Sequence, residues 1–337
     1  SKLLSMMDIN GNKPEIYMCT TNRSGGKTTW FNRYCVKRFI NYGEKFMLLQ
    51  RFNYELEDCA DKFFKDIERL FFQGHVMTER RRAKGIFYEL ILDGNVCGYA
   101  VALNNADQLK KYSHFFSDTV RMVMDEFQSE TNHYCGDEVK KFRSIHTSVA
   151  RGNGAQSRYL PVYMLSNPVT LLNPYYVAMG VSTRLTDNVN FLRGTGWVLE
   201  QGYVDSASKA QQESAFNSAF SGDNYDVYLT QAVYLNDSSA FIETPTGSSR
   251  YLGTIRYLGK EYALREFPNQ GVIYCDDRPD ATCRVKMALT TDDHRVNYVM
   301  LNQFRLFVEN MRYYFDRGAF RFKNLICKEV ILKMLSY

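Results

Sequence analysis

The sequence predicts an α/β protein with two domains, the first built around a mostly parallel β-sheet. Apolar strands and amphipathic helices alternate from residue 1 to about residue 205, as is typical of a parallel sheet covered by helices. The composition changes near residue 206, and the segment that follows is rich in β patterns and ends in helices. With 337 residues, the chain is long enough for two such domains.

Apolar periodicity delimits the elements of the first domain, which we expect to span residues 1–205. In chain order they are a strand at 16–19, a helix over 27–41 that ends at Gly43, a strand at 46–49, a helix over 54–72, hairpin strands 86–92 and 96–103 around the turn Asp93-Gly94-Asn95, a strand at 120–124, a helix over 138–150 and a strand at 160–165. The alternation favours parallel strands joined by helical crossovers.

A helical linker, residues 206–235, separates this domain from a smaller α+β domain, residues 236–337. Residues 206–220 are rich in Ala, Ser and Gln, and a β pattern extends over about 225–291. The clearest strands of this pattern are 251–258 and 262–267, around the turn Gly259-Lys260, followed by 272–275 and 285–289. The domain then ends in a helix over 296–314 and a second helix after Asn324.

Composition and charge narrow the functional classes. Hydrophobic residues make up 45% and charged residues 23% of the chain, a globular composition that excludes extended disorder. No apolar run approaches the roughly 18 residues that a transmembrane helix needs, and we expect no signal peptide. Eight cysteines without a C-x-x-C pair indicate reduced thiols in a cytoplasmic protein. Residues 294–337 carry eight Lys and Arg against three Asp and Glu, which fits either a polyanionic partner or, more often, a solvated helix face.

The stretch CTTNRSGGKTTW, which begins at residue 19, has the ending of a phosphate-binding loop. Gly26-Lys27-Thr28 matches the end of the pattern G-x-x-x-x-G-K-[ST], but Thr21 stands where the pattern asks for a first glycine. The predicted strand before the loop and helix after it supply the required context. Lys27 would reach the β- and γ-phosphates, and the Thr28 hydroxyl would bind Mg²⁺. The alternative is a turn tipped by a lysine, without a ligand.

A second motif, VRMVMDEF, places two carboxylates at the end of an apolar strand. In phosphate-loop enzymes, an aspartate at the end of such a strand coordinates Mg²⁺ through water, so Asp125 would have this role. Glu126 directly after it is suited to orient and deprotonate an attacking water, which favours hydrolysis over phosphoryl transfer to a metabolite. Taken alone, the pair is also compatible with an ordinary acidic strand end. The two motifs together predict an ATPase.

A third motif, YMLSNP, ends the strand at 160–165 in Ser166-Asn167. A polar side chain there could touch the γ-phosphate or the attacking water and report hydrolysis to the rest of the fold. The alternative is an Asn-Pro pair that only opens a turn.

The order of these motifs along the chain resembles a known family. The segments that carry the resemblance are NRSGGKT (22–28), RFINYGEKF (38–46), MDEF (124–127), LSNPVTLLNPYY (165–176) and LTTDD (289–293). They resemble the DNA-packaging ATPases, or encapsidation proteins, of phi29-like bacteriophages, which are distant relatives of terminase large subunits. The resemblance extends over nearly the whole chain.

The resemblance implies roles for individual residues. An arginine inside the loop and a missing first glycine are features of terminase-type loops, so Arg23 would pair with the γ-phosphate or with Glu126. Ser166-Asn167 would be the sensor, and Asp125 would hold Mg²⁺. The implied nucleotide-binding residues are Arg23, Ser24, Gly25, Gly26, Lys27, Thr28 and Thr29.

An arginine finger is also implied at the end of the helix over 138–150. The best match is Arg151 in SVARGNG, which we expect to act on the nucleotide of a neighbouring subunit. Arg158 is the competing candidate, because residues 152–155 include an apparent insertion. The alternative for Arg151 is a cation that only stabilises the helix C-terminus.

For the smaller domain, the resemblance implies an RNase H-like fold. In large terminases this fold holds a two-metal nuclease built from carboxylates. The acidic pairs here, Asp276-Asp277 and Asp292-Asp293, do not form a convincing set of three or four ligands. We therefore expect a vestigial nuclease domain that serves in docking.

The resulting hypothesis is an ATP- and Mg²⁺-dependent motor that moves double-stranded DNA into a viral prohead. By resemblance it would form a pentameric ring at the portal, in the cytoplasm of the infected host, with prohead RNA as a further candidate partner. Candidate DNA-binding residues are Lys110, Lys111 and Arg51, whereas Arg80-Arg81-Arg82 is more typical of a solvated turn. The alternatives are a DNA-dependent ATPase of recombinase or helicase type and a non-hydrolysing assembly module with a degenerate loop.

Overall fold

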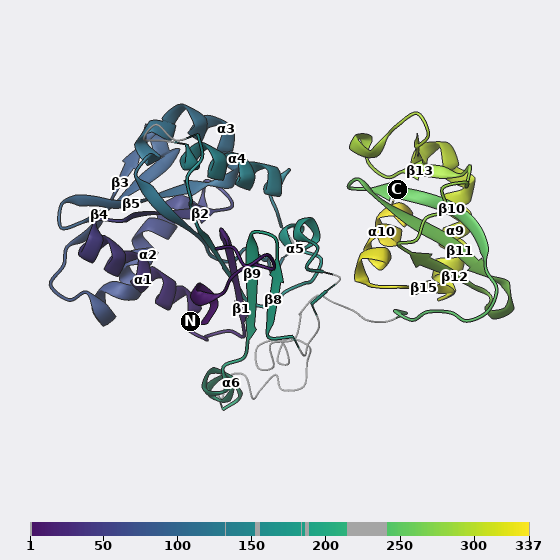
Figure 1. Ribbon diagram of the computed structural model, residues 1–337, viewed down its shortest axis with the longest axis horizontal. Coiled ribbons are helices and arrows are strands. Elements are labelled where there is room, and N and C mark those ends of the chain that lie inside the picture. Colours follow the sequence, from purple (N-terminus) through teal and green to yellow (C-terminus); the bar gives the residue numbers. More distant parts are fainter. Residues whose placement is uncertain are drawn as a thin grey trace. The chain divides into compact units, whose positions relative to one another are not determined.

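The computed structural model describes residues 2–131, 133–151, 156–182, 184–185, 189–213 and 241–336. The chain divides into two compact units, residues 1–181 with 185–236 and residues 182–184 with 237–337. Figure 1 shows the elements of each unit.

A nine-stranded sheet forms the centre of the first unit. In spatial order its strands are β3 (Met77–Arg82), β4 (Phe87–Leu92), β5 (Asn95–Ala102), β2 (Lys45–Gln50), β6 (Thr119–Met124), β7 (Val162–Ser166), β1 (Ile16–Thr21), β9 (Trp197–Gly202) and β8 (Phe191–Gly194). The six central strands β5, β2, β6, β7, β1 and β9 run parallel to one another. Antiparallel pairs occur only toward the two edges of this described sheet, where β3 pairs with β4, β4 with β5, and β8 with β9. The predicted α/β class with a mostly parallel sheet is confirmed.

Helices cover this sheet on both faces. They are α1 (Lys27–Tyr42), α2 (Glu55–Phe71), α3 (Ala106–Leu109), α4 (Glu138–Ala150), α5 (Pro174–Met179), α6 (Asp205–Gln212) and the 3-10 helices η1 (Lys2–Ser5), η2 (Ala83–Gly85), η3 (Leu103–Asn105) and η4 (Lys110–Phe116). Alternate side chains of a strand point to opposite faces, so Phe46 and Leu48 pack with α1 and α2, while Met47 and Leu49 belong to the cluster that includes α4 and α5. Both faces are therefore buried, as a parallel sheet requires.

The parallel register brings the three sequence motifs to one edge of the sheet. Thr20 of β1 lies beside Ser166 of β7, and Met124 of β6 lies beside Met164, which also belongs to β7. Because parallel strands all end on the same side, the segments that follow β1, β6 and β7 converge there. In Figure 1 this is the edge at which β1 leads into α1.

One predicted turn is in fact a strand. Arg80, Arg81 and Arg82 belong to β3, which pairs antiparallel with β4 at the edge of the sheet. Glu89 of β4 is buried and forms ion pairs with Arg80 and Arg82, which explains how such a basic segment is held in a ladder. Charged edge strands of this kind also discourage pairing with other chains. Strands β8 and β9 and helix α5 were not predicted either.

The second unit is a six-stranded mixed sheet with helices. Its strands, in spatial order, are β14 (Val299–Met300), β13 (Lys286–Ala288), β10 (Arg250–Tyr257), β11 (Lys260–Phe267), β12 (Val272–Asp276) and β15 (Phe320–Phe322). Its helices are η5 (Pro268–Gln270), η6 (Thr291–Asp293), η7 (Leu301–Phe304), α9 (Arg305–Asp316) and α10 (Leu325–Leu335). Figure 1 shows α10 beside β15 and β12. The hairpin of β10 and β11 matches the predicted one closely.

The predicted helix over 296–314 is wrong in its first half. Residues 299–300 form β14, which pairs parallel with β13, and α9 begins only at Arg305. Buried Tyr298 precedes β14 and bridges back to Arg295, so the apolar spacing that resembled a helix belongs to a strand and a turn. Predicted elements that fall on 214–240 lie outside the described residues. Among the helices described, none is long and apolar enough to cross a bilayer.

Candidate functional site

The loop between β1 and α1 is shaped by its glycines and its left-handed residues. Ser24 and Gly26 have positive φ values of 60° and 74°, and Gly26 directly precedes the first residue of α1. Gly25 has no room for a side chain, because a Cβ there would lie 2.8 Å from Thr21 Oγ1. Thr21, which replaces the first glycine of the pattern, is the buried last residue of β1. The loop therefore keeps a strand–loop–helix geometry without that glycine.

A pair of hydrogen bonds ties this loop to the segment after β9. The side-chain amide of Asn22 donates to the Val204 carbonyl over 3.2 Å, and Val204 N donates to Asn22 Oδ1 over 2.9 Å. Asn22 is completely buried. The sequence analysis missed this contact, since a pairing between residues 182 positions apart leaves no local pattern.

Lys27 lies against the end of β7. Its ammonium group donates to Asn167 Oδ1 over 2.6 Å, across a sequence separation of 140 residues. Burial lowers the pKa of Lys27, and the nearby carboxylates of Asp125 and Glu126 oppose that shift. The structure thus brings the lysine of the first motif into contact with the asparagine of the third.

Thr28 and Asp125 meet across the same edge. The Thr28 hydroxyl donates to Asp125 Oδ1 over 3.2 Å, which joins the start of α1 to the end of β6. Burial raises the pKa of Asp125, while the hydrogen bond from Thr28 acts in the opposite direction. A hydroxyl and a carboxylate oxygen are ligands suited to Mg²⁺, so these residues fit that ion.

Glu126 is exposed and lies between two hollows in the surface. One cavity of about 310 Å³ is also lined by Thr28, Asp125 and Lys62, and another of about 290 Å³ by Arg23 and Asn167. The backbone of Glu126 is left-handed, with a φ of 54°, which is unusual for a residue other than glycine. Such strain occurs mainly at functional sites.

Arg23 projects from the loop toward the segment after β6. Its Nη1 atom lies 3.9 Å from Oε1 of Glu130, a loose and half-exposed ion pair. The predicted partner Glu126 lines the same cavity, but the ion pair that Arg23 forms here is with Glu130. Ser166, predicted as a sensor with Asn167, is buried and donates to the Asn167 carbonyl over 2.7 Å.

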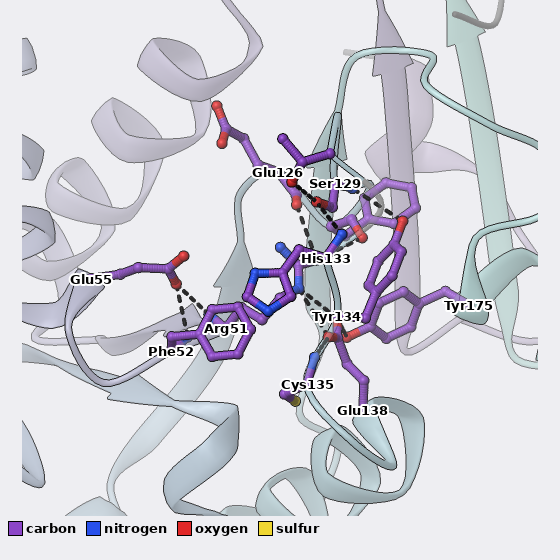
Figure 2. A network of polar contacts seen from close by, with 12 residues as sticks. Arg51, Phe52, Glu55, Glu126, Ser129, His133, Tyr134, Cys135, Glu138 and Tyr175 are labelled. Atoms are coloured by element: carbon purple, nitrogen blue, oxygen red, sulfur yellow. Dashed lines mark hydrogen bonds and ion pairs between the residues drawn. The ribbon is translucent and has the colours of Figure 1, made fainter. Parts of the chain in front are cut away.

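The prediction that Arg51 contacts DNA does not fit its environment. Its side chain is buried, forms an ion pair with Glu138 and donates to the carbonyls of Glu126 and Phe127 (Figure 2). A guanidinium already held by a carboxylate and two carbonyls is not presented to a phosphate backbone. No local pattern indicates this pairing, because Arg51 and Glu138 lie 87 residues apart.

The predicted finger lies at the edge of a basic groove. Arg151 is exposed directly after α4, and Arg158 is half-buried, with Nη2 donating to the Val149 carbonyl over 2.9 Å. This bond ties Arg158 to α4 of the same chain and leaves Arg151 better placed to reach elsewhere. The groove has a volume of about 680 Å³ and is lined by Lys110, Lys140, Arg143, Arg151, His114 and the hydroxyl residues Ser113, Ser117, Ser144, Thr147 and Ser148. Lys111 lies on η4 next to Lys110 and is exposed.

The acidic pairs of the second unit have structural partners. Asp276 accepts from Arg265 Nε over 2.9 Å, and Asp277 pairs with Lys323. Asp293 is buried and accepts from the backbone of the turn between β10 and β11, whereas Asp292 is exposed. Within the described part of the chain, no group of three His, Cys, Asp or Glu side chains is arranged to hold a metal ion.

Comparison with known proteins places this geometry in a family. Residues 11–336 match the Podovirus DNA encapsidation protein (Gp16) family. The DNA packaging protein of Bacillus phage phi29 is 25% identical over 316 residues, which cover 93% of this chain and 90% of that protein. The DNA packaging protein of Bacillus phage B103 is 24% identical over 320 residues, which cover 93% of this chain and 94% of that protein.

Solved structures show the same fold. A chain of the bacteriophage Phi-29 viral genome packaging motor assembly superimposes with a TM-score of 0.69 at 24% identity, covering 99% of this chain and 98% of that one. The Phi-28 gp11 DNA packaging motor gives a TM-score of 0.62 at 14% identity, with coverage of 100% and 97%.

Proposed function

The chain belongs to the podovirus DNA encapsidation protein family, and from this premise we propose that it is the ATP-hydrolysing motor that drives double-stranded DNA into a viral prohead. One observation carries the proposal. Lys27 of the loop contacts Asn167 of the third motif over 2.6 Å, and Thr28 contacts Asp125 of the second motif over 3.2 Å. A phosphate loop, an acidic strand end and a polar strand end at one edge are the parts that a phosphate-loop ATPase needs.

The loop would bind the triphosphate of ATP. Backbone N–H groups of residues 23–29 and the N-terminus of α1 supply donors for phosphate oxygens. Lys27 would exchange its contact with Asn167 for the β- and γ-phosphates. Mg²⁺ would be held by Thr28 and by Asp125, directly or through water, and would supply positive charge that neutralises the phosphates.

Glu126 would act as the general base. Its exposed carboxylate would orient a water molecule for in-line attack on the γ-phosphorus and accept a proton from that water. The bond from the γ-phosphorus to the bridging oxygen then breaks, which yields ADP and inorganic phosphate. Arg23 would stabilise negative charge on the γ-phosphoryl group, and Ser166-Asn167 would sense its departure.

DNA would bind largely through charge. The groove lined by Lys110, Lys140 and Arg143, with Lys111 beside it, offers cations and hydroxyl groups to a phosphate backbone, whatever the base sequence. We propose a homo-oligomeric ring, pentameric as the family resemblance suggests, that attaches to the portal in the infected host, with prohead RNA as a further candidate partner. In such a ring Arg151 would reach the neighbouring nucleotide.

The second unit would serve in docking. We propose that residues 1–205 form the ATPase domain, residues 206–235 a linker and residues 236–337 a vestigial RNase H-like nuclease domain. The carboxylates of Asp276 and Asp277 are engaged by Arg265 and Lys323, which leaves little acidic surface for metal ions.

Measurement of ATP turnover by the full chain tests this function, with and without duplex DNA and proheads. We expect Mg²⁺-dependent hydrolysis that rises when both are present. Lys27→Ala should abolish it, because no other residue replaces the charge of the ammonium group on the phosphates. Wild-type turnover in Lys27→Ala would exclude the loop as the site. Activity on single strands without a portal would favour a helicase, and failure to bind ATP–Mg²⁺ in calorimetry would favour an assembly module.

A further inference from the structure

The backbone at Glu126 is held in a strained conformation by hydrogen bonds from both sides. Its N–H donates to Asp125 Oδ1 over 3.0 Å, and its carbonyl accepts from Arg51 Nη2 over 3.3 Å. The next carbonyl, of Phe127, accepts from the same Arg51 nitrogen over 3.0 Å. A left-handed residue other than glycine persists only where its surroundings fix it. Arg51 supplies the contacts on the carbonyl side.

Arg51 is itself held rigidly at the end of β2. Its Nε atom lies 3.0 and 2.9 Å from the two carboxylate oxygens of Glu138, and its guanidinium lies over the ring of Tyr134 at 4.9 Å. Its backbone N–H donates to Glu55 Oε2 over 2.9 Å, and the Phe52 N–H donates to the same oxygen over 2.8 Å. Both ends of the arginine are therefore anchored (Figure 2).

Glu138 has its own set of partners. It is buried, with 3% of its surface exposed, and it accepts from Cys135 N and from the Tyr175 hydroxyl, each over 2.9 Å. These donors fix the Glu138 carboxylate in place beside the buried guanidinium of Arg51. In Figure 2, Glu138, Tyr134 and Tyr175 lie on one side of Arg51 and Glu126 on the other.

We propose that Arg51, fixed by Glu138, is a positioning residue that holds the backbone of Glu126 so that its carboxylate faces the reacting phosphate. This inference rests on the proposed hydrolytic role of Glu126. Arginine suits the task because its planar fork bonds a carboxylate and two carbonyls at once, whereas a lysine ammonium is a compact point charge on a flexible stem. A small displacement of a catalytic group is costly, since about 1 Å can lower a rate about 100-fold.

The test compares Arg51→Lys with a matched control, Arg121→Lys, in the full chain. Arg121, on β6, is also buried in the first unit, pairs with Glu44 and lies over the ring of Tyr34 at 5.3 Å, so its partners differ from the Glu126 and Phe127 carbonyls that Arg51 bonds. We expect Arg51→Lys to lower kcat about 10- to 100-fold with an unchanged Kd for ATP–Mg²⁺. Amide hydrogen exchange over residues 124–128 should become faster in Arg51→Lys and stay unchanged in Arg121→Lys.

Each possible result of these measurements either supports or contradicts the proposed role of Arg51. Equal kcat values for Arg51→Lys and Arg121→Lys, or a loss of ATP affinity with kcat intact, would overturn the inference. If Arg51→Lys does not unfold cooperatively, Glu138→Gln is measured in its place and should show the same split between kcat and Kd. A wild-type chain that binds ATP–Mg²⁺ without hydrolysing it would instead overturn the proposed function, and the exchange measurement would still show whether Arg51 holds the backbone.

Discussion

Lys27 illustrates how much of the site depends on single side chains with competing partners. Its ammonium group is buried against Asn167, and burial lowers its pKa. A triphosphate would compete with the asparagine for that ammonium and would favour its charged form. Nucleotide binding would therefore break the hydrogen bond between Lys27 and Asn167, the residue proposed to sense the γ-phosphate. The loss of this bond would link nucleotide binding to the end of β7.

Glu126→Gln separates binding from chemistry. Glutamine keeps the shape and hydrogen bonding of the side chain but cannot accept the proton of the attacking water. We expect ATP–Mg²⁺ to bind with wild-type affinity in calorimetry and to be hydrolysed roughly 10²–10⁴-fold more slowly. If affinity were lost instead, Glu126 would be a metal ligand and its assignment as the base would be wrong.

Gly25→Ala tests the closeness of the phosphate loop to the end of β1. The new Cβ would lie 2.8 Å from Thr21 Oγ1 and 3.3 Å from the Asn22 carbonyl, so the loop must shift. Because the loop donors would then miss the phosphates, we expect ATP–Mg²⁺ affinity to fall about 10-fold or more. Gly43→Ala at the other end of α1 is the control: its φ is 68° but nothing lies within 4 Å, so it should cost about 1 kcal/mol of stability and leave affinity unchanged. Equal affinities for the two variants would contradict the close contact.

Among the elements, the turn between β10 and β11 gives a buried carboxylate a structural role. Asp293 accepts from Leu258 N over 2.9 Å, from Gly259 N over 2.7 Å and from the Thr290 hydroxyl over 2.6 Å. It therefore satisfies both backbone donors of a turn in which Leu258 has a φ of 50°. This gives a structural role to one member of the acidic pair Asp292-Asp293, which the sequence analysis did not expect to bind metal ions.

Asp293→Asn should destabilise the second unit. An amide can accept through only one oxygen, so at least one of the three donors loses its partner, at a cost of about 1 kcal/mol in the free energy of unfolding. Thermal unfolding followed by circular dichroism measures the loss, and Asp292→Asn, at an exposed neighbour, should show none.

With Mg²⁺ or Mn²⁺, the wild-type chain should not cleave DNA. Metal-dependent cleavage that Asp292→Asn or Asp277→Asn abolishes would make the second unit an active nuclease.

Local patterns were enough to predict elements that carry a clear apolar period. Helix α2 and the hairpin of β4 and β5 lie within one or two residues of their predicted bounds. Strand β3 was missed because its exposed arginines hide an edge strand that exists only by pairing with β4. The first half of the predicted helix over 296–314 failed for the related reason that β14 exists by pairing with β13. Pairing partners far along the chain are invisible to a local period.

The same limit applies to the site. The three motifs could be placed on strand ends, and a parallel sheet then brings strand ends together, so the contacts of Lys27 and Thr28 follow from fold and motif. Arg51 was misassigned because its partner Glu138 lies at the start of a helix 87 residues away. A lone arginine after a strand carries no sign of burial.

At the scale of the whole molecule, α4 links two parts of the proposed mechanism. Glu138, its first residue, holds Arg51 beside Glu126, and Arg151 follows its last residue. A helix of 13 residues therefore runs from the carboxylate that holds Arg51 to the edge of the basic groove. A shift at one end of a rigid helix is transmitted to the other, so closure at Arg151 could bias the position of Glu126.

Arg151 should act on the nucleotide of a neighbouring subunit. It is exposed and lines a groove whose lining residues include none of the phosphate-loop residues, so its own nucleotide is a poor target. Arg151→Ala and Glu126→Gln should each be nearly inactive, since one lacks the stabilising charge and the other lacks the base. Mixed rings contain some interfaces that pair an intact Arg151 with an intact Glu126, and we expect these to restore part of the ATP turnover.

The mixture distinguishes action between subunits from action within one. If Arg151 served its own nucleotide, every subunit of a mixed ring would lack either the arginine or the base, and turnover would stay at the level of the separate variants. Subunit exchange must be verified in the same samples, for example by energy transfer between labelled chains. Arg158→Ala mixed with Glu126→Gln is the matched control. Arg158 is tied to the Val149 carbonyl of α4 in the same chain, so the mixture should give no complementation beyond the residual activity of Arg158→Ala. Recovery with Arg158→Ala and none with Arg151→Ala would move the finger to Arg158.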